Sequence, residues 1–443
     1  MRGQPVMSRQ DQLPNHQFVQ FVLPNGSQLV AVPDVHAHGV GIAVSLPGSR
    51  FEPKPLLGHV TEHLIADREP YPSYTQFAAE VDKRTTGFNA EIYREAMSFV
   101  FGTTVSDLPE TIDFAYRVIV RSRFSERMLK REIPGLVVEE KLDDDTIDGM
   151  LADLVDETLF SGHILGQRLF GSRQEMFAIS VADIRHWHQR IIHSPIAVAV
   201  YGNVDPTPVH RWVSRRFGRL PSRGPLDTPR FVSRQSKLRI RTIQWPTQLI
   251  HIAVATFLPF GLGHSHRLVL SALNNHLGEQ KRWGNRLLIR LIGKDRSTDR
   301  LVYSADSNIW NNRDCGKLVA TTQAEPDKVE EVLRRIVEEY DRLRSQPLTE
   351  QELAVAKKWM VSLSARRNQD PERHAQFLAE QALVVGRPLV HQSFVDAVER
   401  SVTAERIQRA ARRYLRRDRT SVILVGPVKR LRPRAIRRAL AAL

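Results

Sequence analysis

The chain has 443 residues, of which 42% are hydrophobic and 26% are charged. This composition excludes a wholly disordered or collagen-like chain, and the length is sufficient for more than one hydrophobic core. The formal net charge of +15 leaves open a nucleic acid or another anionic partner.

The first half of the chain alternates between strand and helix patterns. A β-hairpin is predicted over residues 18–34, because two apolar strands flank Pro24-Asn25-Gly26 and Asn-Gly is a strong turn signal. Further strands are predicted for residues 39–50, 95–105 and 195–206. Apolar residues three and four positions apart predict helices over residues 56–66, 74–85, 108–121, 126–142 and 145–160.

The second half repeats this plan after a break. Residues 218–237 are rich in Pro, Gly, Ser and Arg and lack apolar periodicity, which is typical of a linker. A strand pattern at 248–259 then resembles 39–47, and one at 420–429 resembles the strand at 195–206. Helices are predicted at 264–292, 326–346 and 349–366. We therefore predict an α+β protein with two similar halves, residues 1–218 and 238–443, joined by a linker at 219–237.

Cysteine content and apolar runs bear on the location of the protein. Cys315 is the only cysteine, so an intrachain disulfide is impossible and a disulfide-stapled secreted scaffold is excluded. Residues 1–17 carry charge without a following apolar run, so no signal peptide is expected. No stretch approaches the roughly 18–20 apolar residues that span a bilayer. We expect a cytoplasmic protein with no membrane segment.

The most informative segment is the H-x-x-E-H motif formed by His59, Glu62 and His63 within the predicted helix 56–66. Residues four apart lie on one face of a helix, so both imidazoles can reach one zinc ion. Glu62 lies off that row and can accept a proton from a zinc-bound water. A catalytic zinc site needs three protein ligands, so a further ligand, a carboxylate, is expected from elsewhere. With 16 histidines in the chain, chance is the alternative origin of one such match.

The motif and the residues after it resemble the insulinase, pitrilysin and mitochondrial processing peptidase family of zinc peptidases, the inverzincins. Glu139 stands 76 residues after His63, at the spacing of that family's third ligand, and Glu132 precedes it by seven residues. The resemblance implies that His59, His63 and Glu139 bind Zn²⁺. It also implies that Glu62 is the catalytic base and that Glu132 assists catalysis as an electrostatic partner.

The segment around Glu139 leaves alternatives open. Glu140 is adjacent and ranks second as a ligand, and a solvated helix face is the alternative for all these glutamates. Pro134-Gly135 departs from the family pattern, because proline inside a helix removes a hydrogen bond. Pro134 could instead mark the first turn of a helix that carries Glu139.

The resemblance also implies residues that contact substrate. Asn89 and Ala90, in the segment GFNA, are similar to the family's edge strand that pairs with the substrate backbone. Arg296 precedes Tyr303 by seven residues, as do an arginine and a tyrosine that touch substrate in active members. Arg290 is a rival to Arg296, because the segment from Asn285 is about one helical turn longer than the family pattern. For Arg290, Arg296 and Tyr303, the alternative is an ordinary surface or packing role.

For the whole chain, the resemblance implies two homologous α/β-sandwich domains, each a mainly antiparallel sheet covered by helices, which form half of a clamshell. It implies a zinc-dependent endopeptidase that hydrolyses peptides or unfolded segments or matures a precursor peptide. It also implies a homodimer, or a heterodimer with a homologous subunit that lacks the zinc motif.

Two other functions fit parts of the sequence. A non-catalytic, substrate-binding subunit of a heterodimeric peptidase has no physical reason to keep a complete zinc motif. A basic nucleic-acid-binding protein would need a clustered basic face with exposed aromatic residues. The arginines are instead scattered and concentrate only at 412–419 and 429–438, so nucleic acid is not expected. If arginines line the substrate chamber, acidic peptides should be favoured.

Overall fold

The structure is a computed structural model and describes residues 18–66, 74–144, 146–169, 171–228, 230–279, 285–292 and 301–443. The chain divides into two compact units. Unit 1 comprises Met1–Leu142, Arg168–Pro229 and Leu363–Phe394, and unit 2 comprises Asp143–Gln167, Arg230–Ser362 and Val395–Leu443. The sequence predicts two contiguous halves. In the structure, unit 1 also contains Leu363–Phe394 from the second half, and unit 2 also contains Asp143–Gln167 from the first half.

Unit 1 is built on a six-stranded sheet with the order β1-β2-β6-β3-β5-β4. Its strands are β1 (Val19–Val22), β2 (Gln28–Pro33), β3 (Val40–Pro47), β4 (Gly87–Ile92), β5 (Ala96–Thr103) and β6 (Ala197–Gly202). The β2–β6 pair is parallel and the other neighbouring pairs are antiparallel. The predicted hairpin of β1 and β2 is confirmed, and Gly26 in its turn has a φ of +81°, which glycine adopts without strain.

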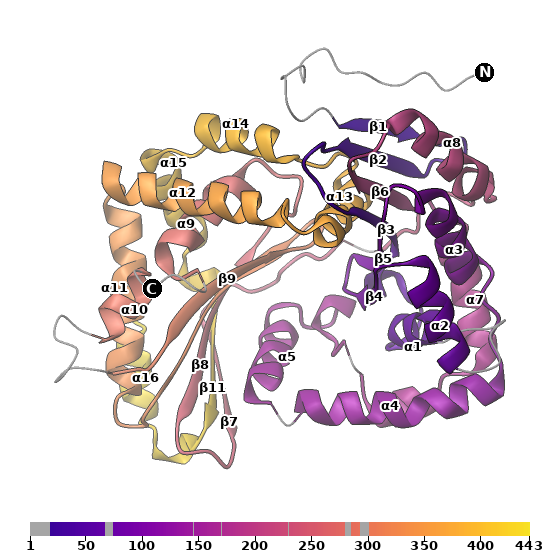
Figure 1. Cartoon of the computed structure of the whole chain (residues 1–443). Helices are drawn as coiled ribbons and strands as arrows, with labels where there is room; N and C mark the ends of the chain where they lie inside the picture. The colour runs from indigo at the N-terminus through magenta and orange to yellow at the C-terminus, as the bar shows by residue number, and fades with distance from the viewer. Residues whose placement is uncertain are drawn as a thin grey trace. The chain divides into compact units, whose positions relative to one another are not determined.

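Helices cover both faces of this sheet (Figure 1). The helices of unit 1 are α1 (Leu57–Ala66), α2 (Tyr74–Arg84), α3 (Leu108–Val120), most of α4 (Glu126–Asp144), α6 (Arg173–Phe177), α7 (Val181–Ile192), α8 (Pro206–Arg216) and α13 (Pro371–Val385). The main core lies between the sheet and helices that include α1, α3 and α7, with Val60, Phe114 and Trp187 fully buried. On the opposite face, Ala375 and Ala379 of α13 allow that helix to approach the sheet closely.

Unit 2 is built on a five-stranded sheet with the order β7-β11-β8-β10-β9. Its strands are β7 (Arg239–Gln244), β8 (Ile250–Leu258), β9 (Ala305–Asn311), β10 (Gly316–Ala324) and β11 (Thr420–Gly426). Its helices are α5 (Ile147–Leu159), α9 (His266–Leu277), α10 (Arg286–Ile292), α11 (Val329–Ser345), α15 (Ala404–Tyr414) and α16 (Pro433–Ala439), while α12 (Glu350–Arg367) and α14 (His391–Ser401) have residues in both units. Leu151, Val155 and Leu159 of α5 pack into the core of this sheet.

The two sheets have one topology. The order β2-β6-β3-β5-β4 in unit 1 corresponds to β7-β11-β8-β10-β9 in unit 2, and in both the first pair is parallel and the others are antiparallel. Helix α1 follows β3 as α9 follows β8. The predicted α+β fold with two similar sandwich domains is therefore confirmed.

Two sequence expectations about helices differ from the structure. Helix α4 is continuous through Pro134, so the alternative that Pro134 begins a new helix is wrong. Pro134 and Gly135 are exposed, so water can satisfy the carbonyl that lacks a backbone donor. The single helix expected over 264–292 is also wrong, because α9 ends at Leu277 and α10 begins at Arg286. Between them, a side chain at Gly278 would collide with the backbone N of Ser307, at 2.8 Å.

No helix in the described ranges is both long enough and apolar enough to cross a membrane.

Candidate metal centre

Helix α1 carries the H-x-x-E-H motif, and its first turn is held by the carboxyl group of Glu52. Glu52 Oε2 accepts the backbone N–H of Gly58 at 2.6 Å, and Glu52 Oε1 accepts that of Leu56 at 3.1 Å. Both bonds satisfy donors at a helix start, where intrahelical acceptors are absent. Leu56 has a φ of +69°, a costly conformation for leucine that this cap supports. Burial raises the pKa of Glu52 to about 8.

The apolar side of α1 fixes the direction of its polar side. Val60, Leu64 and Ile65 are fully buried in the core of unit 1. The hydroxyl of Thr61 donates to the carbonyl of Leu57 at 2.7 Å. Because these residues orient the helix, His59 and His63 lie together on its other side, one turn apart.

Three potential ligand atoms converge beside α1. The Nε2 atoms of His59 and His63 are 3.1 Å apart, and each lies 3.3 Å from Glu139 Oε2 of helix α4. Glu139 Oε2 is shielded from solvent and finds no well-formed hydrogen bond. An atom of this kind, facing two imidazole nitrogens, is what a bound cation would satisfy.

Two further carboxylates complete the cluster. Glu132, two turns before Glu139 on α4, has its Oε1 atom 3.1 Å from His63 Nδ1. An Nδ1–H that donates to this carboxylate leaves the Nε2 lone pair of His63 available. Glu62 Oε2 lies 3.9 Å from His63 Nε2, and the Glu62 side chain is buried. Glu62 thus lies beside the convergence point of the three atoms without being one of them.

The electrostatics of the cluster follow from burial and from the excess of carboxylates. Burial raises the pKa of Glu62 to about 7 and lowers that of His59. Burial also opposes protonation of His63, but its contacts with Glu132 and Glu139 raise the pKa of His63 to about 10. The close contacts with His59 and His63, at 3.3 Å, hold the pKa of Glu139 far below its usual range. The cluster therefore has a strong affinity for positive charge.

The donor set fits zinc. Imidazole nitrogen and carboxylate oxygen are common zinc ligands, and atoms about 2.0–2.2 Å from a tetrahedral zinc lie about 3.3–3.5 Å from one another. The observed separations of 3.1 and 3.3 Å are close to this. Among the residues that the structure describes, His59, Glu62 and His63 form the one group of three metal-ligating side chains with all ligand atoms within 4.8 Å.

Glu140, the second-ranked ligand, faces away from the histidines. Its side chain is buried, and its Oε2 accepts the Nε–H of Arg173 at 2.8 Å. The structure therefore favours Glu139 over Glu140 as a metal ligand, because adjacent positions on a helix point about 100° apart and it is Glu139 that contacts the histidines of α1.

The edge strand expected to contact substrate lies next to α1. Asn89 and Ala90 belong to β4, the last strand of the sheet, which pairs on one side with β5. Ile92 of β4 lies against Gly58, where an added side-chain carbon would be 2.6 Å from it. Asn89 Nδ2 donates to Glu91 Oε1 at 2.9 Å.

The remaining substrate residues lie in the second half of the chain. Arg296 lies outside the described residues. Tyr303 belongs to unit 2, and 77% of its surface is exposed. Arg290 is the alternative to Arg296 as a substrate contact. Its guanidinium contacts Glu338 at 3.1 Å and Glu339 at 3.9 Å.

Two family models match most of the chain. The insulinase model of peptidase family M16 matches residues 30–173, and the M16 inactive-domain model matches residues 178–360. The chain belongs to the insulinase family. Its homologues include proteins named as zinc proteases, so the coarse function of the family is that of a zinc protease.

Relatives of this insulinase-family chain span nearly its whole length. An uncharacterised zinc protease of Mycobacterium tuberculosis is 27% identical over 425 residues, which cover 94% of this chain and 95% of the relative. The mitochondrial-processing peptidase subunit beta of Blastocladiella emersonii is 23% identical, with 92% of this chain and 88% of that protein covered.

Solved structures share the fold of this insulinase-family chain. A protease from Helicobacter pylori superposes with a TM-score of 0.82 at 20% identity, covering 94% of this chain and 100% of that one. A structure described as the M16 inactive domain from Pseudomonas fluorescens has a TM-score of 0.81 at 16% identity, with 95% and 100% covered.

The sequence analysis missed the role of Glu52. A glutamate a few residues before the motif is a weak signal for a helix cap, because the connecting residues must turn back for its side chain to reach Gly58. The turn depends on the left-handed conformation of Leu56, which the residue type does not favour.

Proposed function

We propose that this chain is a zinc-dependent endopeptidase that hydrolyses peptides or unfolded segments. The observation that carries the proposal is the convergence of His59 Nε2, His63 Nε2 and Glu139 Oε2, at 3.1–3.3 Å from one another. These three residues would hold the metal. When bound, zinc lowers the pKa of a water ligand to about 7 and polarises a peptide carbonyl.

Glu62 is assigned the proton transfers. Its carboxylate lies beside the ligand cluster, and the third ligand position is assigned to Glu139, which contacts both histidines. In this position Glu62 takes the proton of the attacking water and later delivers it to the leaving amine. Glu132 orients the His63 ring through Nδ1 and is a positioning residue.

Substrate binding is assigned to β4. As the last strand of its sheet, it presents backbone groups to an extended peptide, and Asn89 and Ala90 lie at its centre. Strand addition reads the backbone more than the side chains, so a range of unfolded sequences should bind.

The direct test replaces Glu62 by glutamine. The Glu62→Gln variant should bind about one zinc per chain, as the unmodified protein does, and should lose peptide hydrolysis by about 100-fold or more. Glu126→Gln is the matched control, because Glu126 is an exposed glutamate at the start of α4. Zinc is measured by atomic absorption, and hydrolysis with a peptide library in the presence and absence of a chelator. Undiminished hydrolysis by the Glu62→Gln variant would refute the assignment.

A second candidate function is a substrate-binding subunit without activity of its own. It is favoured by the likeness to the Pseudomonas fluorescens structure described as an inactive domain. The two functions differ in one measurement, because a subunit of this kind would leave the peptide library intact even when loaded with zinc.

We further propose that the chain works as a homodimer, or with a homologous subunit that lacks the zinc motif. Native mass spectrometry of the purified chain should show a dimer in the first case. In the second case, a monomer should gain activity when the homologous subunit is added.

A further inference from the structure

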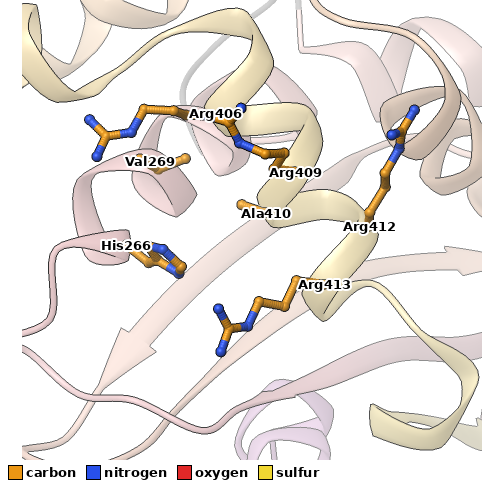
Figure 2. Close-up of a pocket in the computed structure, with 7 residues that line it drawn as sticks. All are labelled: His266, Val269, Arg406, Arg409, Ala410, Arg412 and Arg413. Carbon is orange, nitrogen blue, oxygen red and sulfur yellow. The ribbon is translucent and has the colours of Figure 1, made fainter.

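A basic pocket lies in unit 2 between helices α9 and α15, and it has a volume of about 560 Å³ (Figure 2). Its charged or titratable lining residues are His266, Arg406, Arg409, Arg412 and Arg413. Val269 and Ala410 supply the apolar part of the lining, and no carboxylate contributes to it. The pocket is therefore a concave surface of a single charge sign.

The arginines are presented by one helix. Arg406, Arg409 and Arg413 are three and four residues apart, so they share one face of α15. Figure 2 shows Arg413 extending toward His266 of α9, and Arg406 reaching over Val269. Arg412 projects to the other side of α15, and its Nε donates to the carbonyl of Arg344 at 2.6 Å. Three guanidinium groups thus belong to the pocket side of the helix.

The charge of this row is only partly balanced, by the exposed Glu405 one turn before Arg409 on α15. Within the described part of the chain, none of the four lining arginines forms an ion pair with an acidic side chain, and Arg406 donates instead to the carbonyl of Ser401. Elsewhere in unit 2, Arg335 and Arg342 each contact a glutamate of α11 or α12. Like charges one turn apart destabilise a helix, so α15 carries a repulsion that a bound anion would remove.

Neighbouring groups carry further signs of excess positive charge. The Nδ1 atom of His266 is 2.6 Å from the hydroxyl of Tyr414, and the Tyr414 ring has Arg413 and Arg419 within 6 Å of its centroid, at 5.6 and 5.8 Å. The Nε and Nη1 atoms of Arg419 are buried without a hydrogen-bond partner among the described residues. Burial and the charges of His264, Arg413 and Arg406 hold the pKa of His266 below its usual value.

We propose that this pocket binds a multiply charged, phosphate-bearing anion. The planar guanidinium group matches phosphate oxygens with two parallel hydrogen bonds. A single carboxylate carries one negative charge, whereas a phosphate monoester carries about 1.5–2 and a diphosphate more, which suits a row of several arginines. Helix α15 lies beyond residues 30–173 and 178–360, which the family models match, and the pocket includes none of the residues of the candidate metal centre.

The test is calorimetric titration of the full-length chain with inorganic pyrophosphate at constant ionic strength. The unmodified protein should bind one pyrophosphate per chain. The double variant Arg409→Gln/Arg413→Gln should bind at least about tenfold more weakly, because charge-assisted hydrogen bonds are lost. The matched control is Arg434→Gln/Arg437→Gln, which removes the same charge from exposed positions of α16 and should keep the affinity within about twofold.

Absence of pyrophosphate binding, or an equal loss in both double variants, would overturn the proposal, since diffuse surface charge would then explain the data. Circular dichroism verifies that each variant is folded, and Arg409→Lys/Arg413→Lys should bind with intermediate affinity because it keeps the charge but not the planar fork.

Sedimentation with vesicles that contain phosphatidate distinguishes the source of the phosphate. Loss of sedimentation in Arg409→Gln/Arg413→Gln alone supports a lipid headgroup, and no sedimentation of any variant supports a soluble phosphate compound.

Discussion

Helices α1 and α9 follow equivalent strands in two sheets of one topology, but their buried polar groups are arranged in different ways. In α1, two imidazole nitrogens face a carboxylate oxygen at 3.3 Å. In α9, the Asn274 amide is paired with its surroundings: Nδ2 donates to Glu279 Oε2 at 2.7 Å, and Oδ1 accepts the Ser307 hydroxyl at 2.7 Å.

The difference shows how one fold can serve either binding or stability. Around Asn274 of α9, donors meet acceptors, so the hydrogen bonds of this amide close within the protein. Around α1, acceptor atoms gather with too few protons between them, and the pKa of His63 is raised because its proton relieves part of the negative charge. A bound divalent cation would neutralise more of this negative charge than one proton does. The topology alone therefore does not create the candidate metal centre, which depends on the carboxylates that α4 adds.

The two helices also differ in how their first turns are capped. Glu52 caps α1 through two backbone N–H groups, whereas Ser265, at the start of α9, makes no side-chain capping bond. The cap fixes the first turn of α1, one residue before His59. A metal ligand needs an accurate position, so the cap suits the proposed role of His59.

The largest expected effect is at Glu139. Glu139→Gln should weaken zinc affinity by more than about 100-fold and abolish most hydrolysis, because the proposed metal ligand loses its charge. Glu140→Gln, one position along α4, should leave zinc affinity within a few-fold, since its carboxylate pairs with Arg173. Zinc affinity is measured by competition with a chelating dye. Equal losses in both variants would contradict the distinction drawn between the two glutamates.

A smaller effect is expected at Glu132. Glu132→Gln should lower zinc affinity by about 10–100-fold, because the His63 ring loses its charged partner at Nδ1. Glu132→Asp should recover part of the affinity where Glu132→Ala does not. If Glu132 only supports the fold of α4, thermal unfolding will change in these variants while the zinc affinity of the folded protein stays constant.

In α9, the expected effect is on stability alone. Asn274→Ala should lower the free energy of unfolding by about 1–3 kcal/mol, because the buried Ser307 hydroxyl loses its partner. Zinc content should stay at its original value. Urea denaturation measures the first quantity and atomic absorption the second, and a loss of zinc without a loss of stability would break the contrast between α1 and α9.

The smallest effect is a pH dependence from Glu52. Its pKa in the folded chain, about 8, lies above the ordinary value of 4.5, so folding favours the protonated form. This stabilisation is complete below about pH 4.5 and declines as the pH rises through 8. The Glu52→Gln variant should therefore lose less stability than the unmodified protein between pH 5 and pH 9, as measured by urea denaturation. Glu126→Gln should keep the original pH dependence, and identical curves for all three proteins would contradict the role of Glu52.

Local features of the chain could be predicted from its sequence. The Asn25-Gly26 turn depends on backbone preferences, and the placement of His59 and His63 on one face depends on the period of a helix. Both are properties of a few neighbouring residues, so they do not require knowledge of distant packing. The repeated strand patterns likewise indicate two similar halves.

Other features were decided by tertiary structure. Helix geometry says that Glu139 and Glu140 point in different directions, but only the packing of α4 against α1 selects Glu139. Helix α13 joins the first sheet although its sequence lies in the second half, because its small residues fit that surface. The arginines of α15 form a pocket only where α9 supplies the facing wall. The physical reason is that sequence spacing determines which side chains share a face, whereas the distance between faces depends on how the whole core packs.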